Sequence, residues 1–247
     1  MILKNEKIDI SVVIPIWNEE KENIREIYCG LSTILKEAGW TYQIIFVDDG
    51  SRDNIFQILM NLSQEDKNIT VIKFTKNFGQ TAAFLAGFEY AKGDIVVTMD
   101  ADLQYLPDEM PKFMEKINEG ADFVSGYRIY RRDPFFRRIT SSVINRIIGY
   151  RTGVKLRDWG CSFNAVKKEL SSQLKMFGIN ARFIKAILAK RAKVVAEVGV
   201  KHYPRRHGKS KYNFFRLSKL GLDYILFYSL KPLKKNKPVF ITKEVIG

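Results

Sequence analysis

The sequence contains few of the residues on which zinc proteins, disulfide-rich proteins and triad hydrolases depend. Its 247 residues include only two cysteines and two histidines. Cys29 and Cys161 are too few for a disulfide framework, and their spacing is not that of a metal-binding pair. The only imidazoles are His202 and His207, and there is no Gly-x-Ser-x-Gly elbow, so a catalytic triad has little support. Two thiols without partners are typical of a reducing compartment, and we therefore expect a cytoplasmic protein.

Long apolar stretches and the glycine-rich motif of dinucleotide enzymes are also absent. The best apolar run, 220–230, includes Asp223 and is shorter than the roughly 20 residues that a membrane span requires. Residues 1–6 contain no apolar core of a secretion signal. No Gly-x-Gly-x-x-Gly follows the first predicted strand, which argues against a dinucleotide cofactor. The sequence thus predicts neither a membrane span nor a secreted protein.

Acidic residues are scarce in the second half of the chain. Residues 1–120 contain 12 Lys and Arg and 20 Asp and Glu, whereas residues 121–247 contain 29 and 7. The first half is therefore acidic and the second strongly basic. A basic half suits nucleic acid, an anionic membrane surface or phosphate substrates, although a solvated basic face is the plainer alternative. No zinc finger, RNP-type motif or helix-turn-helix is present, so we expect no nucleic-acid partner.

Apolar strands alternate with helical segments through the first half of the chain. Strands are predicted at 10–16, 43–48, 69–75, 95–99, 122–127 and 194–203, and helices at 22–38, 54–66, 79–91 and 107–118. This alternation favours an α/β fold with a doubly wound, mostly parallel sheet. After residue 127 the pattern is basic and helical, apart from the last strand. We expect one catalytic domain over residues 1–211 and a basic amphipathic segment over residues 212–247.

Three oxygen-bearing side chains follow the predicted strand at 95–99. If the extended chain continues, Asp100, Asp102 and Gln104 point to the same side, because side chains alternate along a strand. Such oxygens suit Mg2+ or Mn2+, with water and nucleotide phosphates completing the coordination shell. Asp-x-Asp also occurs in surface turns, but its place at a strand end favours a metal site, with Asp102 as the firmest ligand.

Two other predicted strands end in acidic or amide side chains. Asp48 and Asp49 follow the strand at 43–48, and Asn18 and Glu19 follow the strand at 10–16. Ligands of open α/β sheets bind at the carboxyl ends of the strands. Helix capping would explain one acid at each strand end but not a doubled acid at two of them. The pattern therefore predicts a ligand site at this edge of the sheet.

These motifs follow one another in a recognisable order. They lie at 13–19, 47–53, 77–80, 93–94 and 99–104. Together they resemble the family 2 glycosyltransferases of the GT-A fold. Two later stretches, 158–161 (Asp-Trp-Gly-Cys) and 205–212 (Arg-Arg-His-Gly-Lys-Ser-Lys-Tyr), resemble the branch that charges polyprenyl phosphates with a sugar. That branch includes dolichol-phosphate mannosyltransferase, GtrB-like glucosyltransferases and undecaprenyl-phosphate aminoarabinose transferases. The resemblance covers about residues 8–230.

The resemblance implies roles for the residues at the strand ends. The nucleotide of a donor such as GDP-mannose or a UDP-hexose would contact Pro15, Asn18, Glu19, Asp48, Asp49 and Asp100. Carboxylates accept hydrogen bonds from ring N–H groups and ribose hydroxyls, so these roles are chemically reasonable. The acceptor would be dolichyl or undecaprenyl phosphate.

The acceptor decides which catalytic groups are needed. A lipid phosphate is already an anion, so it needs charge neutralisation rather than the general base that a sugar hydroxyl requires. The residues predicted to bind the acceptor phosphate are Arg128 and four residues of one basic loop, namely Arg206, Lys209, Ser210 and Lys211. Asp158 is the one candidate base for a hydroxyl acceptor. It could equally be a helix cap or the structural partner of an arginine.

The sequence thus predicts an inverting, metal-dependent glycosyltransferase whose catalytic residues are Asp100, Asp102, Arg128 and Asp158. Two amphipathic segments, 133–148 and 213–230, carry basic residues beside apolar ones and favour attachment to an anionic membrane surface over core packing. We expect peripheral attachment at the cytoplasmic face. Whether the protein forms a homo-oligomer is left open. The alternatives are transfer to a hydroxyl of a glycan or glycolipid, and a non-catalytic anion-binding protein.

Overall fold

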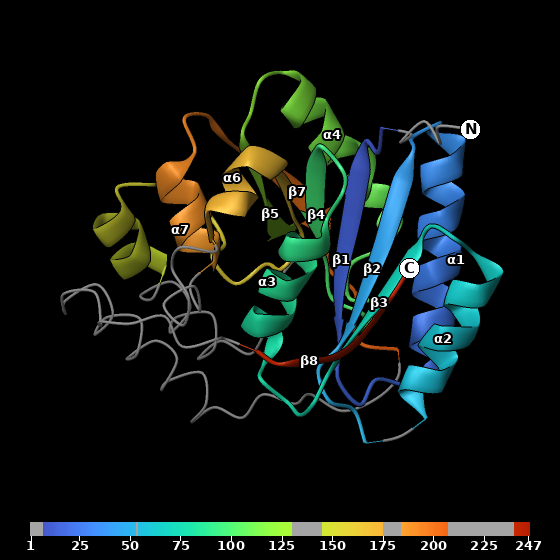
Figure 1. The fold of residues 1–247 in the computed structure, drawn as a ribbon. Coiled ribbons are helices and arrows are strands. Elements are labelled where there is room, and N and C mark those ends of the chain that lie inside the picture. The colour runs from blue at the N-terminus through green and yellow to red at the C-terminus, as the bar shows by residue number, and fades with distance from the viewer. Residues whose placement is uncertain (1–6, 53, 130–144, 175–183, 207–239) are drawn as a thin grey trace.

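The computed structural model describes residues 7–52, 54–129, 145–174, 184–206 and 240–247. These residues form one eight-stranded sheet with helices on both faces (Figure 1). The order of the strands is β7-β5-β6-β4-β1-β2-β3-β8. The strands are β1 (Ile10–Ile16), β2 (Tyr42–Asp48), β3 (Ile69–Phe74), β4 (Ile95–Thr98), β5 (Phe123–Ile129), β6 (Asn164–Lys167), β7 (Val195–Lys201) and β8 (Thr242–Ile246).

The sheet is mostly parallel, which confirms the fold class predicted from the sequence. Strands β4, β1, β2 and β3 pair in parallel, as do β5 and β7. Strand β6 lies between β4 and β5 and is antiparallel to both. Strand β8 pairs antiparallel with β3 at the edge of the sheet. The carboxyl ends of β4, β1 and β2 therefore meet at one edge, as ligand binding in such sheets requires.

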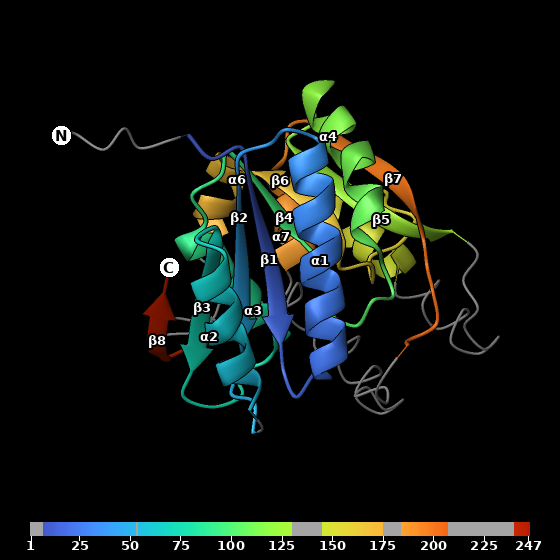
Figure 2. The same cartoon turned by 90° about the vertical axis from the view of Figure 1, so that its right-hand side faces the viewer.

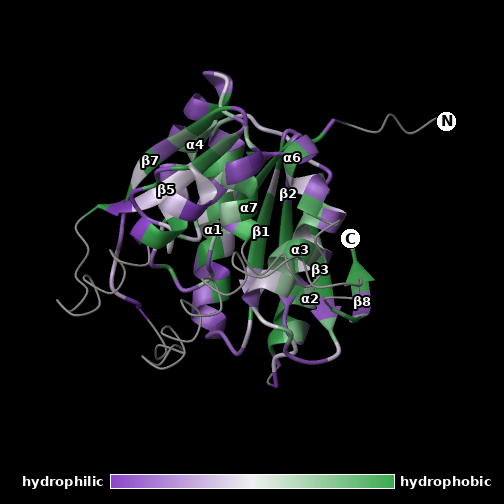
Figure 3. Cartoon of the chain, turned by 90° about the vertical axis from the view of Figure 1, so that its left-hand side faces the viewer, coloured by the Kyte–Doolittle hydropathy of each residue, from purple (hydrophilic) through white to green (hydrophobic). Residues whose placement is uncertain are grey.

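The helices divide between the two faces of the sheet. They are α1 (Lys21–Glu37), α2 (Ile55–Glu65), α3 (Gln80–Tyr90), the 3-10 turn η1 (Pro107–Glu109), α4 (Met110–Asn118), α6 (Lys168–Ser172) and α7 (Ile184–Arg191), and residues 145–152 are also helical. Helices α1, α2 and α4 share one apolar cluster, and α3, α6 and α7 share another. Figure 2 shows the first group in front of the sheet, and Figure 3 shows the opposite side.

The alternation of β1 explains why both faces need helices. Ile10, Val12 and Ile14 belong to the cluster beneath α1, whereas Val13 belongs to the cluster beneath α3. All four side chains are fully buried. A strand that is apolar on both faces requires cover on both, because each exposed face would leave apolar surface in water. In Figure 3 the strands β1 and β2 at the centre of the sheet are coloured as mostly hydrophobic.

Two strands escaped the sequence analysis, which expected a helical pattern after residue 127 with one further strand. Strand β6 has four residues and β8 has five, so neither is long enough to display a reliable alternation. Strand β8 also belongs to the stretch 212–247 that was expected to form a separate C-terminal segment. Its pairing with β3 places these last residues in the sheet. The ends of the remaining predicted strands and helices differ from the observed ones by at most two residues.

Most of the two predicted amphipathic segments, 133–148 and 213–230, lies outside the described residues. Only 145–148 of the first is described, and there the chain is helical, with Ile148 buried. Within the described ranges, no helix combines the length and the apolar character needed to cross a bilayer.

Candidate active site at the carboxyl ends of the strands

Residues 101–105, which directly follow Asp100 and include Asp102, form a bend (the aspartate bend) instead of continuing the strand. Strand β4 ends at Thr98, and within the bend Leu103 has a positive φ of 57°. The alternation that placed Asp100, Asp102 and Gln104 on one side therefore does not extend through this stretch. The two carboxylates still interact, since the charge of Asp102 helps to raise the pKa of Asp100.

Asp100 is held by two residues from distant parts of the chain. Its Oδ1 accepts a hydrogen bond from Nε2 of Gln80 at the start of α3, and its Oδ2 accepts one from Oγ of Ser162, 2.6 Å away. Loss of solvation raises the pKa of Asp100 to about 7, and the charge of Asp102 acts in the same direction. The hydrogen bonds oppose this shift but do not cancel it. An additional cation at this position would favour the charged form.

Asp102 is buried and is paired with an arginine that follows β7. Its Oδ2 lies 2.7 Å from Nη2 of Arg205, and its Oδ1 accepts a hydrogen bond from the backbone N–H of Gln104 at 3.2 Å. Loss of solvation raises the pKa of Asp102, while Arg205 lowers it and the charge of Glu19 raises it. Three interacting carboxylates, those of Asp100, Asp102 and Glu19, thus lie at this site, and the guanidinium of Arg205 contacts one of them, Asp102.

The residues at this edge fit a divalent cation. Hard oxygen donors are present on Asp100 and Asp102, and burial raises the pKa of both carboxyls. Among the residues that the structure describes, no three His, Cys, Asp or Glu side chains group so as to hold a metal unaided. This donor set matches the usual mode of Mg2+, which binds one or two carboxylates and completes its shell with water and substrate phosphates.

Gln104 turns toward the segment after β7. Its Nε2 donates to the backbone oxygen of Tyr203 at 3.4 Å, and the N–H of Tyr203 donates to the backbone oxygen of Gln104 at 3.0 Å. The His202 ring packs on the Tyr105 ring, with centroids 5.5 Å apart. The backbone of 202–205 is thereby tied to the aspartate bend. A role of Gln104 as a metal ligand stays a prediction.

The loops after β1 and β2 bind one another. The backbone N–H of Asn18 donates to Oγ of Ser51 at 3.0 Å, and the N–H of Arg52 donates to Oδ1 of Asn18 at 2.9 Å. Asn18 adopts a positive φ of 45° to do so, a conformation that asparagine tolerates better than most residues. These contacts fix the two loops as one wall of the site.

Asp48 is fully buried at the end of β2 and only half satisfied. Its Oδ1 accepts a hydrogen bond from the N–H of Ser51 at 2.9 Å. Its Oδ2 is buried and has no hydrogen-bond partner among the described residues. A buried acceptor without a donor costs free energy, so this oxygen is a suitable acceptor for an incoming ligand. A contact between Asp48 and the nucleotide stays a prediction.

Asp49 organises the loop that leads into α3. Its carboxylate accepts hydrogen bonds from Nδ2 of Asn77 at 2.8 Å, from the N–H of Phe78 at 2.6 Å and from the N–H of Gly79 at 2.9 Å. Burial raises the pKa of Asp49 to about 6, although the two backbone hydrogen bonds lower it. Both oxygens are thus already used within the protein. A nucleotide contact by Asp49 remains a prediction from the resemblance.

The other predicted nucleotide contacts lie along the same edge. Pro15 is partly buried within β1, directly beside Val47 of β2. Glu19 accepts a hydrogen bond from Nδ2 of Asn23 at 2.8 Å, and its charge acts on Asp102. Glu19 therefore lies between the predicted nucleotide wall and the aspartate bend.

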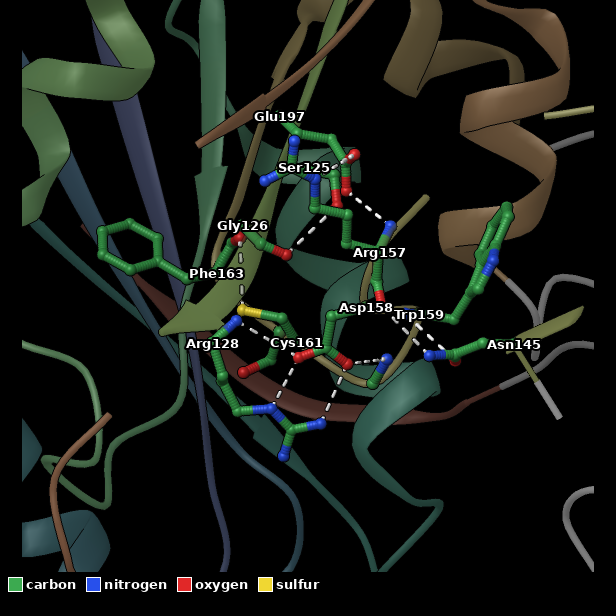
Figure 4. Close-up of polar contacts among 12 residues, drawn as sticks. Ser125, Gly126, Arg128, Asn145, Arg157, Asp158, Trp159, Cys161, Phe163 and Glu197 are labelled. Atoms are coloured by element: carbon green, nitrogen blue, oxygen red, sulfur yellow. Dashed lines mark hydrogen bonds and ion pairs between the residues drawn. The ribbon is translucent and has the colours of Figure 1, made fainter. Parts of the chain in front are cut away.

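Arg128 and Asp158 form a bidentate ion pair (Figure 4). Nε of Arg128 lies 2.6 Å from Oδ2 of Asp158, and Nη2 lies 2.9 Å from Oδ1. The Asp158 side chain also accepts a hydrogen bond from the N–H of Gly160 at 3.0 Å. Although burial opposes its charge, Asp158 holds the pKa of Arg128 above its ordinary value. Of the roles left open for Asp158, the structure therefore shows the partner of an arginine.

Gly126 and Gly160 lie where an added side chain would crowd its neighbours. A Cβ on Gly160 would lie 3.0 Å from Nη2 of Arg128, and one on Gly126 would lie 2.6 Å from the backbone oxygen of Phe163. Nζ of Lys185 supports the same loop by donating to the backbone oxygens of Asp158 at 2.7 Å and Cys161 at 3.1 Å. The loop that ends at Ser162 is consequently fixed by an ammonium and a guanidinium.

The predicted acceptor loop is described only at its beginning. Arg206 is half-exposed and forms an ion pair with Glu26 of α1. Lys209, Ser210 and Lys211 lie outside the described residues. Their role in binding an acceptor phosphate stays a prediction.

Several residues of the site were not identified from the sequence. Gln80 and Ser162 contact Asp100, and Lys185 holds the 158–161 loop. Arg205, which belongs to the predicted phosphate-binding loop, instead forms an ion pair with Asp102. Gln80 stands in a motif of the family resemblance, and Arg205 stands in the basic loop, but neither pattern names its partner. Ser162 precedes β6, which was itself not predicted.

The sheet is mostly parallel, and acidic side chains follow the ends of β1, β2 and β4. The sequence family described as Glycosyl transferase family 2 matches residues 11–170. That match covers more than half of the chain, and the protein belongs to this family. A curated relative, the undecaprenyl-phosphate 4-deoxy-4-formamido-L-arabinose transferase of Pseudomonas fluorescens (strain SBW25), is 37% identical over 239 residues, which are 96% of this chain and 70% of the relative.

Solved structures share the fold. The mannosyl-3-phosphoglycerate synthase of Rubrobacter xylanophilus has a TM-score of 0.65 and 16% identity over 90% of this chain and 73% of its own. The glucosyl-3-phosphoglycerate synthase of Mycobacterium tuberculosis, solved with Mn2+, UDP-glucose and phosphoglyceric acid, has a TM-score of 0.61 and 18% identity over 89% and 78%. At these identities the similarity establishes the fold alone.

The substitution Asp49→Asn should change both the stability and its dependence on pH. An amide has one acceptor oxygen and would place an NH2 group against a donor, which should cost about 1–3 kcal/mol. Because burial raises the pKa of folded Asp49 to about 6, above the ordinary aspartate value of 3.8, its protonated form contributes stability that is fully present below pH 3.8 and lost as the pH rises through 6. Urea unfolding between pH 4 and 7 should show a smaller decline for the variant. The same substitution at exposed Asp108 should alter neither quantity, and equal slopes for wild type and D49N would contradict the assignment.

The substitution Asp158→Asn should destabilise the protein by about 3 kcal/mol, because it leaves Arg128 buried without its counter-charge. Urea unfolding measures the change. Glu197→Gln is the matched control, since Glu197 meets the exposed guanidinium of Arg157 at 3.9 Å and such pairs contribute less than about 1 kcal/mol. A loss in D158N no larger than in E197Q would show that the Arg128–Asp158 pair has no structural role.

Proposed function

We propose that this family 2 glycosyltransferase transfers a sugar from a nucleotide-sugar donor to a polyprenyl phosphate, with inversion at the anomeric carbon. The observation that carries the proposal is the Arg128–Asp158 ion pair, which engages the one candidate general base that the sequence offers for a hydroxyl acceptor. A phosphate acceptor needs no such base, because it is already an anion. The acceptor named for the 37% identical relative is undecaprenyl phosphate, which supports the same conclusion.

The proposed donor site is the edge formed by β1, β2 and β4. Asp48 offers a buried acceptor oxygen to the nucleotide, and the linked loops of Asn18 and Ser51 form the wall beside it. Asp100 and Asp102 would hold Mg2+ or Mn2+, and this cation supplies a Lewis acid that neutralises charge on the leaving diphosphate. Gln80 and Ser162 orient Asp100 for that role. The Mn2+ and UDP-glucose in the mycobacterial synthase structure support the same kind of donor.

The proposed acceptor site lies beside the second half of the sheet. Arg128, which Asp158 holds at a defined position near the end of β5, would be the first cation of this site. The basic loop that begins at Arg205 would supply further cations to the lipid phosphate. Direct attack by a phosphate oxygen on the anomeric carbon expels the nucleoside diphosphate in one displacement, which accounts for the inversion.

The acceptor can be tested directly with a panel of nucleotide-sugars and undecaprenyl phosphate. A new lipid-linked sugar is expected with one donor of the panel. Glycosylation of sugar hydroxyls without any use of the lipid phosphate would refute the proposal.

The contribution of Arg206 can be separated from that of its ion pair. Arg206→Ala should weaken the use of lipid phosphate by about 1.5–3 kcal/mol for a lost charged hydrogen bond, as measured by the apparent KM for the acceptor. Glu26→Gln removes the partner of Arg206 but keeps the cation, and it should leave that KM unchanged. If both variants impair transfer equally, Arg206 acts through its contact with α1 and not on the phosphate.

The metal site predicts a strict requirement for a divalent cation. EDTA should abolish transfer, and Mg2+ or Mn2+ should restore it. Asp102→Asn should lower the transfer rate by roughly 100-fold or more, because the leaving group then loses its charge compensation. Asp108→Asn, at an exposed position, is the matched control. Full turnover of the wild-type protein in EDTA would rule out the metal assignment.

We further propose peripheral attachment to an anionic membrane surface at the cytoplasmic face, which follows from the basic second half of the chain. Each Lys or Arg near such a surface contributes about 1 kcal/mol, and salt screens this contribution. The protein should therefore co-sediment with phosphatidylserine-containing vesicles at low salt and less at high salt. Equal sedimentation with neutral vesicles would show that charge does not drive the attachment.

A further inference from the structure

The Asp102–Arg205 ion pair has a position that the proposed chemistry does not explain. Arg205 does not belong to the elements that build the donor site, since it follows β7 at the far side of the sheet. Its Nη2 nevertheless lies 2.7 Å from Oδ2 of Asp102, with the two side chains only 23% and 6% exposed. A contact this close between partly buried charges is strong enough to compete with a ligand.

The segment that carries Arg205 is anchored independently of this ion pair. Tyr203 exchanges two hydrogen bonds with Gln104, and the His202 ring packs on Tyr105. On the other side, Arg206 pairs with Glu26 of α1. Because the backbone on both sides of Arg205 is held, its side chain can leave Asp102 without unfolding the segment.

A divalent cation and Arg205 cannot share Asp102 at low cost. Both would take the same carboxylate, and their like charges would repel each other in a poorly solvated environment. Asp102 without either would be a buried carboxylate next to Asp100 and Glu19, both of which are also acidic. Some cation must therefore stay at this position in both states of the enzyme.

We propose that Arg205 is an exchangeable internal counter-ion, which neutralises Asp102 in the metal-free protein and leaves it when a divalent cation binds. This inference rests on the proposed metal site and not on the identity of the acceptor. Arg205 thus sets the affinity for the metal, because each binding event must first break the ion pair. By linkage, bound metal makes the Arg205 guanidinium available at the start of the basic loop.

The first test measures Mn2+ binding to the protein without nucleotide or lipid, by the electron paramagnetic resonance signal of unbound Mn2+. Arg205→Gln should bind Mn2+ roughly tenfold more tightly than the wild type, because the competing cation is gone. Arg206→Gln removes the same charge from the neighbouring position and should change the affinity by less than about twofold, since salt and solvent screen it. Arg205→Lys keeps the charge and should stay close to the wild type.

The second test requires no variant. Phenylglyoxal modifies accessible guanidinium groups, and mass spectrometry locates the products. Saturating Mn2+ should raise the modification rate of Arg205 roughly twofold or more, as the ion pair is released. Arg206, in the same peptide, should react at an unchanged rate and serves as the internal control.

Three outcomes would overturn the proposal. These are an Arg205→Gln affinity equal to or weaker than that of the wild type, an Arg205 modification rate that Mn2+ leaves unchanged, and a lack of saturable Mn2+ binding in both proteins. None of the measurements involves sugar transfer. A protein that passes them but does not glycosylate polyprenyl phosphate would keep the counter-ion role of Arg205 and lose the proposed acceptor.

Discussion

The structure depends on a concentration of carboxylates where parallel strands end. Asp48, Asp100 and Asp102 are brought to one edge because β2 and β4 flank β1 and run in the same direction. Burial, together with the charge of Asp102, raises the pKa of Asp100 to about 7, although hydrogen bonds and Arg205 act in the opposite direction. Distant segments supply the partial compensation, namely the start of α3, the loop before β6 and the segment after β7. One of these partners, Ser162, lies just before β6, the antiparallel strand that joins the two halves of the sheet.

The predictable part of the fold is the part with long, regular strands. The apolar run at 10–16 matched β1 residue for residue, and the strand at 69–75 was one residue too long, because buried parallel strands are apolar throughout and end at polar turns. Strand β6 could not be found in this way. Its four residues are defined by antiparallel neighbours on both sides, and such pairing is a tertiary constraint that no local pattern carries. Strand β8 is equally short and pairs at a sheet edge.

In the candidate site too, features carried by local sequence patterns could be predicted, and features set by tertiary structure could not. The acids themselves were predictable, because residues at the ends of neighbouring parallel strands must lie close together. Their partners were not, because Ser162 and Arg205 approach from segments whose path depends on β6 and β7. The aspartate bend shows the limit most clearly. The expected alternation failed at Leu103, whose positive φ turns the chain, yet Asp100 and Asp102 still act on each other. For Asp158 the sequence left several roles open, and the bidentate geometry with Arg128 decided among them.

The excess of basic residues in the second half therefore has two uses that composition alone does not separate. Part of it neutralises groups within the protein. Arg128 is fixed on Asp158 by two hydrogen bonds, and Lys185 is fixed on backbone oxygens, so neither can be removed without leaving buried groups unpaired. Arg205 differs in its surroundings, because its carboxylate partner Asp102 is a ligand of the proposed metal site, where a divalent cation would replace it. Some cations of the basic half are thus fixed within the protein, whereas Arg205 would exchange with a divalent cation. Asp102 would then keep a cationic partner while an anionic donor and an anionic acceptor bind in turn.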